Sequence, residues 1–379
     1  MIKILIVIPT LDQSGAEKQF GTLACQLPKS EFDVRVIALT RGGPYEKWLN
    51  ESEIPYSILN KRWRLDPITL IKLRREIRQH QPDVLLSCLF AANTSVRLAT
   101  VGLAHPPVTI ISERCVDSWK SGWQLKLDRC LQDRTDRLVA NSKSVADFYS
   151  GIGFPSERIS VIPNGVDVPP TPATSREALL QELKLPQDAK LIMFVGRLAP
   201  QKRLRDLIWA EQILRQSDPR AYLLICGAGP LRTELELFAQ DTEVTRHVRF
   251  LGHRADAGSL LHLADVFWLA SEFEGMSNSL MEAMACGKPV VVSDIPPNRE
   301  LVQHGRTGYI VNLGDSIGFS QYTERLIQDD ELARQLGEAA RNRMLSEFSN
   351  SIMVQRYGEL IREEVERRRN EQGTSAESQ

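Results

Sequence analysis

Two series of short apolar runs dominate the sequence, and the runs in each series alternate with stretches that have helical spacing. The first series comprises residues 3–9, 34–39, 84–88, 108–112 and 137–141. The second comprises residues 191–195, 222–226, 248–251, 266–270, 289–293 and 309–311. A short apolar run is typical of a strand buried on both faces, and strands that alternate with helices predict a parallel sheet between helix layers. We therefore expect an α/β protein with doubly wound, Rossmann-like sheets.

A proline-rich segment separates the two series. It carries Pro163, Pro169, Pro170 and Pro172 and contains no buried run. Proline disfavours both a helix interior and a central strand, so this segment reads as a linker. A chain of 379 residues is also too long for one ordinary core. We expect an N-terminal domain over 1–167, a C-terminal domain over 168–350, a terminal helix over 351–370 that packs back on the N-terminal domain, and a disordered tail over 371–379.

Charge and cysteine content exclude several classes of protein. Lys plus Arg (47) nearly cancels Asp plus Glu (48), so no global field draws the chain to nucleic acid. The six cysteines are scattered without a C-x-x-C pair, which favours reduced thiols in a cytosolic protein and no zinc site. Residues 2–8 do not resemble a secretory leader, and the longest apolar run, residues 84–92, is far short of the ~20 residues of a membrane span. We expect a cytoplasmic protein that, if it meets a membrane, lies on its surface.

Residues 266–287 predict a strand, a polar loop and a helix in succession. Glu274 lies in the loop, and Glu282 lies inside the helix. The first amides of such a helix, around residues 276–279, have no partner within the helix and would point beyond the end of the strand, where they attract phosphate. A purely structural role explains the residues of this segment equally well. Ser279 and Glu282 fit a capping box, which would leave Glu274 as an ordinary exposed acid.

A second strand end carries two cations. Residues 196–202 read G-R-L-A-P-Q-K. Gly196 permits a sharp turn, after which Arg197 and Lys202 can project toward the same crevice as the loop of Glu274, since ligands of open parallel sheets bind beyond the carboxyl ends of the strands. Alone, two loop cations are usually solvated. Beside a helix N-terminus they match a diphosphate in geometry and in charge.

Other strand ends carry weaker signals. Gly227 and Gly229 form a lone G-x-G, to which we assign a role in loop shape only. Arg254 follows the next strand, where its loop could face a nucleotide base. Gly15 follows the first strand of the chain and would let the backbone approach a phosphate or sugar, although a plain helix start capped by Ser14 explains the same residues.

Four motifs together resemble the family 4 retaining glycosyltransferases of GT-B architecture. They are S-G-A-E at 14–17, I-P-N-G-V-D at 162–167, G-R-L-x-P-x-K at 196–202 and E-F-E-G-M-S-N-S-L-M-E-A-M-A-C-G at 272–287. The resemblance implies two domains facing a central cleft, with the acceptor on the N-terminal domain and a UDP- or GDP-linked sugar on the C-terminal domain. It implies transfer of a hexosyl or N-acetylhexosaminyl group, with retention, to a glycan or lipid-linked acceptor of surface polysaccharide or glycoconjugate synthesis. Neither a metal nor a cofactor is implied, and the chain has no D-x-D element.

The resemblance also implies a donor-binding set: Gly15, Gly196, Arg197, Lys202, Arg254, Glu274, Gly275, Met276, Ser277 and Glu282. In this set Arg197 and Lys202 hold the diphosphate, and with Glu274 they are the catalytic candidates. Glu274 holds hydroxyls of the donor sugar, and Glu282 holds the ribose. A carboxylate nucleophile is a general alternative for retention. The family favours front-face transfer, in which the leaving phosphate accepts the proton of the acceptor.

The chain departs from the family pattern at one place. Many members carry a histidine after the strand that ends here at Ser112, where it contacts the donor sugar or the reaction centre. This chain has I-S-E-R-C at 111–115. Either Glu113 or Arg114 takes over part of that role, or the sugar contacts differ.

A basic segment offers a clue to the acceptor. Residues 61–80 hold seven Lys or Arg against two acids, with apolar residues at amphipathic positions, and Trp119, Lys120, Trp123 and Lys126 form a second basic and aromatic stretch. Such a helix can rest on an anionic membrane surface, at the inner face of the plasma membrane, which suits a lipid-linked acceptor. The alternative is the solvated face of a domain helix.

Two other functions remain open from the sequence. One is a nucleotide-sugar epimerase or hydrolase on the same fold, which would act on the donor without an acceptor. The other is a catalytically silent glycan-binding protein. The intact set of Arg197, Lys202, Glu274 and Glu282 speaks against the silent protein.

Overall fold

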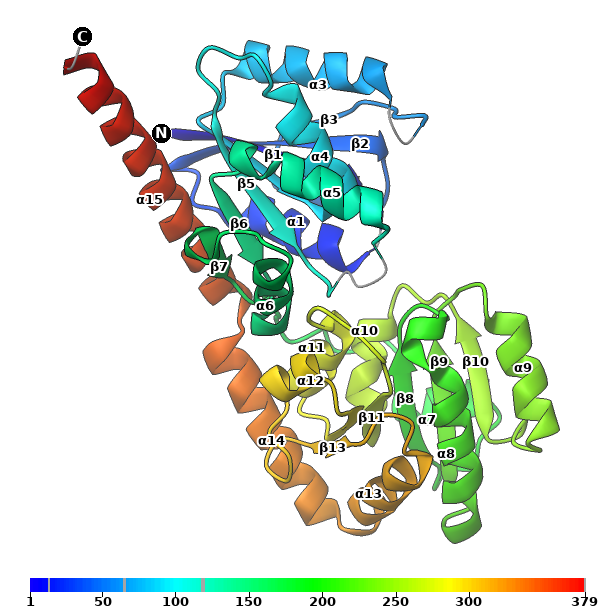
Figure 1. Ribbon diagram of the computed structural model, residues 1–379. Helices are drawn as coiled ribbons and strands as arrows, with labels where there is room; N and C mark the ends of the chain where they lie inside the picture. Colours follow the sequence, from blue (N-terminus) through cyan, green and yellow to red (C-terminus); the bar gives the residue numbers. More distant parts are fainter. Residues whose placement is uncertain (13, 64–65, 117–119, 378–379) are drawn as a thin grey trace. The chain divides into compact units, whose positions relative to one another are not determined.

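A computed structural model describes residues 1–12, 14–63, 66–116 and 120–377. The chain divides into two compact units (Figure 1). The first unit comprises Met1–Gly165 and the terminal segment that begins at Asn350, and the second comprises Val166–Ser349. No helix in the described ranges is both long enough and apolar enough to cross a bilayer.

The first unit is built on a seven-stranded parallel sheet with the order β3-β2-β1-β4-β5-β6-β7. Its strands are β1 (Ile2–Thr10), β2 (Phe32–Arg41), β3 (Tyr56–Ile58), β4 (Val84–Cys88), β5 (Val108–Glu113), β6 (Arg137–Ala140) and β7 (Ile159–Val161). Its helices are α1 (Gly15–Gln26), α2 (Tyr45–Glu51), α3 (Pro67–His80), α4 (Leu89–Ala99), α5 (Gly122–Cys130), α6 (Lys143–Gly151) and α15 (Asn350–Glu377). The five predicted strands are present, and the edge strands β3 and β7 are additional.

Helix layers cover both faces of this sheet. On β1, Ile4 and Ile6 belong to one apolar cluster, which also contains residues of α1 and α15. Leu5 and Val7 belong to a second cluster, which contains residues of α3 and α4. Because successive side chains of a strand point to opposite faces, an uninterrupted apolar run is needed to fill both layers.

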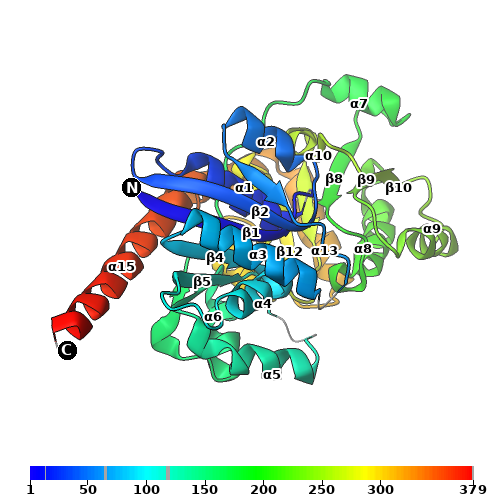
Figure 2. The same cartoon turned by 90° about the horizontal axis from the view of Figure 1, so that it is seen from above.

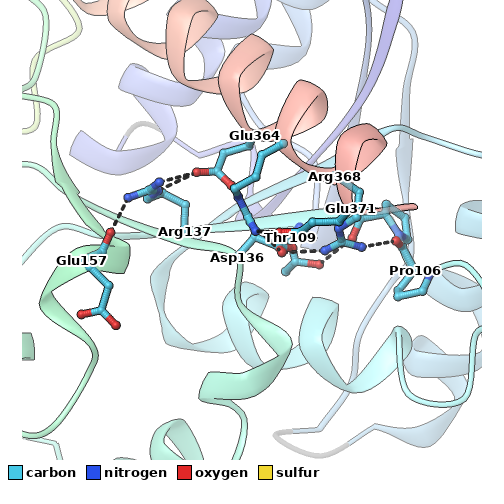
Figure 3. A network of polar contacts seen from close by, with 10 residues as sticks. Pro106, Thr109, Asp136, Arg137, Glu157, Glu364, Arg368 and Glu371 are labelled. Carbon is cyan, nitrogen blue, oxygen red and sulfur yellow. Dashed lines mark hydrogen bonds and ion pairs between the residues drawn. The ribbon is translucent and has the colours of Figure 1, made fainter. Parts of the chain in front are cut away.

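Helix α15 packs against the first unit through apolar and charged contacts. Tyr357 is buried and meets Phe20 of α1 edge-on, with ring centroids 6.2 Å apart. Glu364, 1% exposed, accepts hydrogen bonds of 2.5 and 2.8 Å from Arg137, the first residue of β6 (Figure 3). Arg368 donates to Asp136 at 2.5 Å and to the carbonyl of Pro106 at 2.9 Å. The helix is therefore fixed to one end of the sheet.

The last turns of α15 extend past the strands of the first unit (Figures 1 and 2). The helix continues to Glu377, so residues 371–377 are helical where we expected a disordered tail; residues 378–379 lie outside the described chain. Arg367 and Glu371 form an ion pair of 2.6 Å between neighbouring turns. Such i,i+4 pairs add a few tenths of a kcal/mol, about 0.2–0.5, to an exposed helix.

The second unit is built on a six-stranded parallel sheet with the order β10-β9-β8-β11-β12-β13. Its strands are β8 (Lys190–Val195), β9 (Ala221–Cys226), β10 (Val248–Gly252), β11 (Val266–Leu269), β12 (Val290–Ser293) and β13 (Tyr309–Val311). Its helices are α7 (Arg176–Glu182), α8 (Leu204–Ser217), α9 (Arg232–Asp241), α10 (Ala257–Leu260), α11 (Asn278–Ala285), α12 (Pro296–Leu301), α13 (Ser316–Gln328) and α14 (Asp330–Glu347). All six predicted strands are present. The predicted fold class, two doubly wound parallel-sheet domains, is confirmed.

Candidate functional site

The strand order of the second unit reverses between β8 and β11. From β8 the chain proceeds outward to β9 and β10, whereas β11, on the other side of β8, begins the series that proceeds to β12 and β13. At such a reversal the connections leave the sheet in opposite directions, and ligands of open parallel sheets usually bind beyond the carboxyl ends of the two central strands. The loops that begin at Gly196 and Ala270 are the two that leave this point.

The first loop is shaped by close backbone contact with its neighbour. The amide of Gly196 donates to the carbonyl of Cys226 at 3.0 Å, and the amide of Leu198 donates to that of Ala228 at 3.0 Å. A Cβ atom on Gly227 would lie 1.8 Å from the Gly196 carbonyl oxygen, and one on Gly229 would lie 2.3 Å from that of Leu198. The G-x-G therefore lets two loop backbones touch, which is the shape role assigned to it from the sequence.

Backbone and amide contacts join the first loop to the second. The Gln201 side chain donates to the carbonyl of Phe273 at 2.8 Å, and the amide of Glu272 donates to the carbonyl of Gln201 at 2.9 Å. The two loops thus hold each other in place across the switch point, although 72 positions separate Gln201 and Phe273 in the sequence.

Lys202 and Glu274 form an ion pair at the centre of this contact. Their side chains are 14% and 10% exposed. The Glu274 carboxylate also accepts a hydrogen bond of 2.7 Å from Ser271, whose carbonyl in turn accepts one of 2.6 Å from Ser293 of β12. The ammonium and the carboxylate are therefore both oriented before any ligand arrives, which is the condition for electrostatic preorganisation.

The other two cations of the predicted set have different surroundings. Arg197 is exposed, and no described residue forms an ion pair with its guanidinium. Arg254 is held by Asp256 at 2.9 Å and by Glu182 at 2.8 Å, and these hydrogen bonds raise the pKa of its guanidinium. Arg197 is thus free to meet an anion beside Lys202, whereas the side chain of Arg254 is committed to two carboxylates.

Helix α11 begins where the sequence places an anion site. Ser277 is its N-cap residue, without a side-chain capping bond, so Met276 and Ser277 precede the first turn. Ser279 is the second residue of the helix, and the alternative of a capping box from Ser279 to Glu282 is wrong. Glu282 is half-buried on α11, with its Oε2 atom 3.7 Å from where a Cβ on Gly258 of α10 would lie.

Gly275 lies in the loop before α11, and the remaining predicted residues belong to the first unit, at the carboxyl ends of β1 and β5. Gly15 is the first residue of α1, and Ser14 is its N-cap residue by position but makes no side-chain capping bond. Glu17, to which sequence reasoning gave no role, is buried in the first turn of α1. It accepts a hydrogen bond of 3.0 Å from Thr10, its Oε2 atom has no hydrogen-bond partner in the described part of the chain, and burial raises the pKa of its carboxyl. Its place in the S-G-A-E motif was the available signal.

Glu113 and Arg114 both point into the first unit. Glu113, 1% exposed, accepts from Asn93 at 3.0 Å and from Lys120 at 3.4 Å. Arg114 donates to Asn164 and lies over the ring of Phe20, 5.4 Å from its centroid. A donor-sugar contact by either residue stays a prediction, and Glu113 would have to make it from within a buried charge network.

Two family models match the chain. Glycosyltransferase Family 4 matches residues 13–169, and Glycosyl transferases group 1 matches residues 175–343. Lipopolysaccharide core biosynthesis glycosyltransferase LpsE of Rhizobium meliloti is 28% identical over 92% of this chain and 95% of its own. UDP-Gal:alpha-D-GlcNAc-diphosphoundecaprenol alpha-1,3-galactosyltransferase of Escherichia coli is 26% identical over 88% of this chain and 90% of its own.

Solved structures share the fold. Anabaena Alr3699/HepE in complex with UDP-glucose superposes with a TM-score of 0.84 at 22% identity, over 96% of this chain and 100% of that one. A glycosyltransferase from Rickettsia africae gives a TM-score of 0.80 at 19% identity, over 96% and 99% of the two chains. With both halves of the chain matched by family models, the protein belongs to the family 4 glycosyltransferases of GT-B architecture.

Proposed function

We propose that the protein moves a hexosyl or N-acetylhexosaminyl group from a UDP-linked donor, with retention, to a glycan or lipid-linked acceptor of surface polysaccharide synthesis. Uridine is favoured over guanosine because the E. coli relative is named for UDP-Gal and the Anabaena neighbour was solved with UDP-glucose. The acceptor class follows the names of the Rhizobium and E. coli relatives, which specify lipopolysaccharide core biosynthesis and a diphosphoundecaprenol-linked sugar.

The observation that carries the proposal is the preformed pair of Lys202 and Glu274 beside the unpaired Arg197. We assign Arg197, Lys202 and the amides at the start of α11 to the donor diphosphate. Departure of the sugar leaves negative charge on the diphosphate, so positive groups already aimed at it stabilise the transition state more than the ground state. Glu274 then holds hydroxyls of the donor sugar, and Glu282 holds the ribose.

We propose that the anomeric configuration is retained through front-face transfer. Glu274 is engaged by Lys202 and by Ser271, which suits a carboxylate that orients hydroxyls better than one that attacks the anomeric carbon. The bond between the anomeric carbon and the diphosphate oxygen breaks, the acceptor oxygen bonds on the same face, and its proton goes to the leaving diphosphate. Two side-chain cations supply the positive charge, so the proposal needs no metal ion and no cofactor beyond the donor.

We further propose that α3 brings the protein to an anionic membrane surface on the cytoplasmic side. Leu73 and Ile77 of α3 are buried, whereas Ile68 and Ile71 are 56% and 69% exposed beside several basic residues. Trp123 of α5 is half exposed, and the predicted contribution of Trp119 lies outside the described residues. Co-sedimentation with anionic vesicles should fall on reversing Arg74 and Arg75. Equal sedimentation of the double variant would contradict membrane binding by α3.

A thermal-shift screen over UDP- and GDP-linked sugars tests the donor. A ligand bound only by the folded state stabilises it by about 2.7 kcal/mol at a hundredfold excess over Kd. We expect UDP and at least one UDP-sugar to raise the melting temperature, Arg197→Ala to reduce the shift, and sugar transfer to require an added acceptor. Absence of a shift with every nucleotide sugar, or release of free sugar at the same rate without acceptor, would contradict the proposal.

A further inference from the structure

The first unit contains a cavity that the donor chemistry leaves unused. It measures about 460 Å³ and lies between α3, α4 and α5, beside the end of β1. Its wall is mostly apolar, formed by Leu70, Phe90, Leu98, Trp123 and Leu127. This volume is within the range of about 300–1,000 Å³ that is typical of small-molecule sites, and such sites combine apolar walls with a few polar groups.

One polar group in the cavity wall lacks a partner. Thr94 of α4 lines the cavity and is 6% exposed, and its hydroxyl makes no hydrogen bond with any residue that the structure describes. Buried polar groups in folded proteins are nearly always hydrogen-bonded, so the unpaired Thr94 hydroxyl is an exception that the packing of the described residues around it does not explain.

A lysine lines part of the cavity. Lys61 lines this cavity and also a neighbouring one of about 660 Å³, which Arg62 and Lys72 line as well. The ammonium of Lys61 donates no hydrogen bond to the described part of the chain, and burial lowers the pKa of Lys61. The wall of the apolar chamber therefore includes the ammonium of Lys61, and Arg62 and Lys72 line the neighbouring cavity.

Asp66, the acid whose charge acts on Lys61, already holds the start of α3. Asp66 is the N-cap residue of α3, and its two oxygens accept hydrogen bonds of 3.0 to 3.3 Å from the amides of Arg62, Ile68 and Thr69 and from the Thr69 hydroxyl. These bonds lower the pKa of Asp66 and fix the start of the helix. The charge of Asp66 still acts on Lys61, but the two side chains form no ion pair in the described chain, so the Lys61 ammonium can meet an external anion.

The backbone at the cavity is also strained. Leu89 lines the cavity, follows β4 directly and has a φ of 66°. A left-handed leucine is uncommon and costs on the order of 1–3 kcal/mol, and such strain clusters at sites that bind ligands. The strained residue turns the chain from β4 into α4, which carries both Phe90 and Thr94 to the cavity.

We propose that this cavity takes the hydrocarbon chain of a lipid-linked acceptor whose phosphate or diphosphate binds at Lys61. The inference rests on the proposed function and narrows its acceptor to the lipid-linked class. An apolar chamber with a lysine ammonium in its wall matches an amphiphile that carries phosphate at one end of a hydrocarbon chain. A flat membrane surface would not fill a hollow lined by residues of three helices, although exposed Ile68 and Ile71 on α3 can support entry from a bilayer.

Binding of farnesyl diphosphate tests the proposal, with farnesol and inorganic diphosphate as the two partial probes. We expect farnesyl diphosphate to raise the melting temperature of the full chain and to compete with a lipid-linked acceptor. Leu98→Trp fills the cavity and should weaken binding about tenfold or more, as a misfit in an apolar pocket does. Lys61→Met should weaken binding of farnesyl diphosphate but not of farnesol. The matched control is Leu103→Trp, at a partly buried leucine of the same unit that does not line the cavity.

The outcomes separate this inference from the proposed function. All variants should keep the thermal shift with UDP, because the groups assigned to UDP belong to the second unit. A wild-type protein that responds to UDP but not to farnesyl diphosphate, or a folded Leu98→Trp variant that binds it normally, overturns the cavity proposal and leaves the donor assignment standing. Loss of binding on reversing Arg74 and Arg75, with none in Leu98→Trp, overturns it in favour of surface adsorption. If Leu98→Trp melts early, Leu127→Phe replaces it.

Discussion

Replacing Lys202 with methionine should separate its proposed role in donor binding from its ion pair with Glu274. Methionine keeps most of the side-chain volume and removes the charge. In the free protein the change breaks the ion pair with Glu274, whose carboxylate then keeps only the hydrogen bond from Ser271 in the described chain. In the complex, on the proposed assignment, it also removes a cation from the diphosphate. Loss of the ion pair should lower stability, whereas loss of the cation at the diphosphate should lower activity, so the two effects can be measured separately.

The magnitudes follow from burial. Breaking a fully buried ion pair costs about 3–5 kcal/mol. Because Lys202 and Glu274 are 14% and 10% exposed, we expect a smaller loss of stability, about 1–3 kcal/mol. A charge-assisted hydrogen bond to a diphosphate contributes about 1.5–3 kcal/mol. Its loss corresponds to a fall of about 10- to 150-fold in kcat/KM.

A double-mutant cycle with Glu274→Gln distinguishes the two effects. Glutamine removes the unpaired charge left by Lys202→Met, so the double variant should recover much of the melting temperature and none of the activity. The assays are thermal unfolding, UDP titration and transfer with saturating acceptor. Lys202→Met turning over and binding UDP like the wild type would refute the diphosphate assignment. Recovery of activity in the double variant would show that Lys202 acts only by pairing with Glu274.

Three further predictions concern the scaffold. Gly227→Ala places a Cβ 1.8 Å from a carbonyl oxygen of the neighbouring loop and should lower stability by about 1–3 kcal/mol, whereas Gly151→Ala, with nothing within 4 Å, should be near neutral by urea denaturation. Glu364→Gln leaves Arg137 without its buried carboxylate and should lower the free energy of unfolding by about 2–3 kcal/mol. A melting temperature equal to that of the wild type would contradict this. Burial raises the pKa of the Glu211 carboxyl well above its ordinary value, and both its oxygens lack hydrogen-bond partners in the described chain. Because ionising this carboxyl in the folded protein lowers the free energy of unfolding as pH rises, Glu211→Gln should stabilise the protein more at pH 8 than at pH 5. An equal gain at both pH values would contradict this.

The strands that the sequence predicts best are those buried on both faces. Every residue of β9, β11 and β12 is buried, and apart from Ser293 at the end of β12 their side chains form apolar runs. The edge strands β3 and β7 are three residues long and only partly covered, and neither was predicted. An edge strand packs against one neighbour and needs no continuous run, so its sequence resembles that of a loop.

The sequence predicted which loops carry the residues of the site, but not which residues pair with one another. The motifs placed Lys202 and Glu274 at two strand ends, yet their pairing across 72 positions depends on β8 and β11 being neighbours, which no local pattern specifies. The same limit applies to Arg254, whose partner Glu182 lies on α7. Burial of Glu113 was equally hidden, because a charged residue at the end of an apolar strand reads as the start of a loop.

The pairing of Lys202 with Glu274 also bears on how the enzyme distinguishes donor from product. On the proposed assignment, a bound diphosphate draws the ammonium away from a carboxylate that is nearly buried. An intact nucleotide sugar offers hydroxyl donors to that carboxylate, whereas the nucleoside diphosphate product offers none. Leaving a buried charged group short of a partner costs several kcal/mol at most sites, so product binding carries a penalty that donor binding avoids. The ion pair of the free protein is therefore the state to which the site returns as the product leaves.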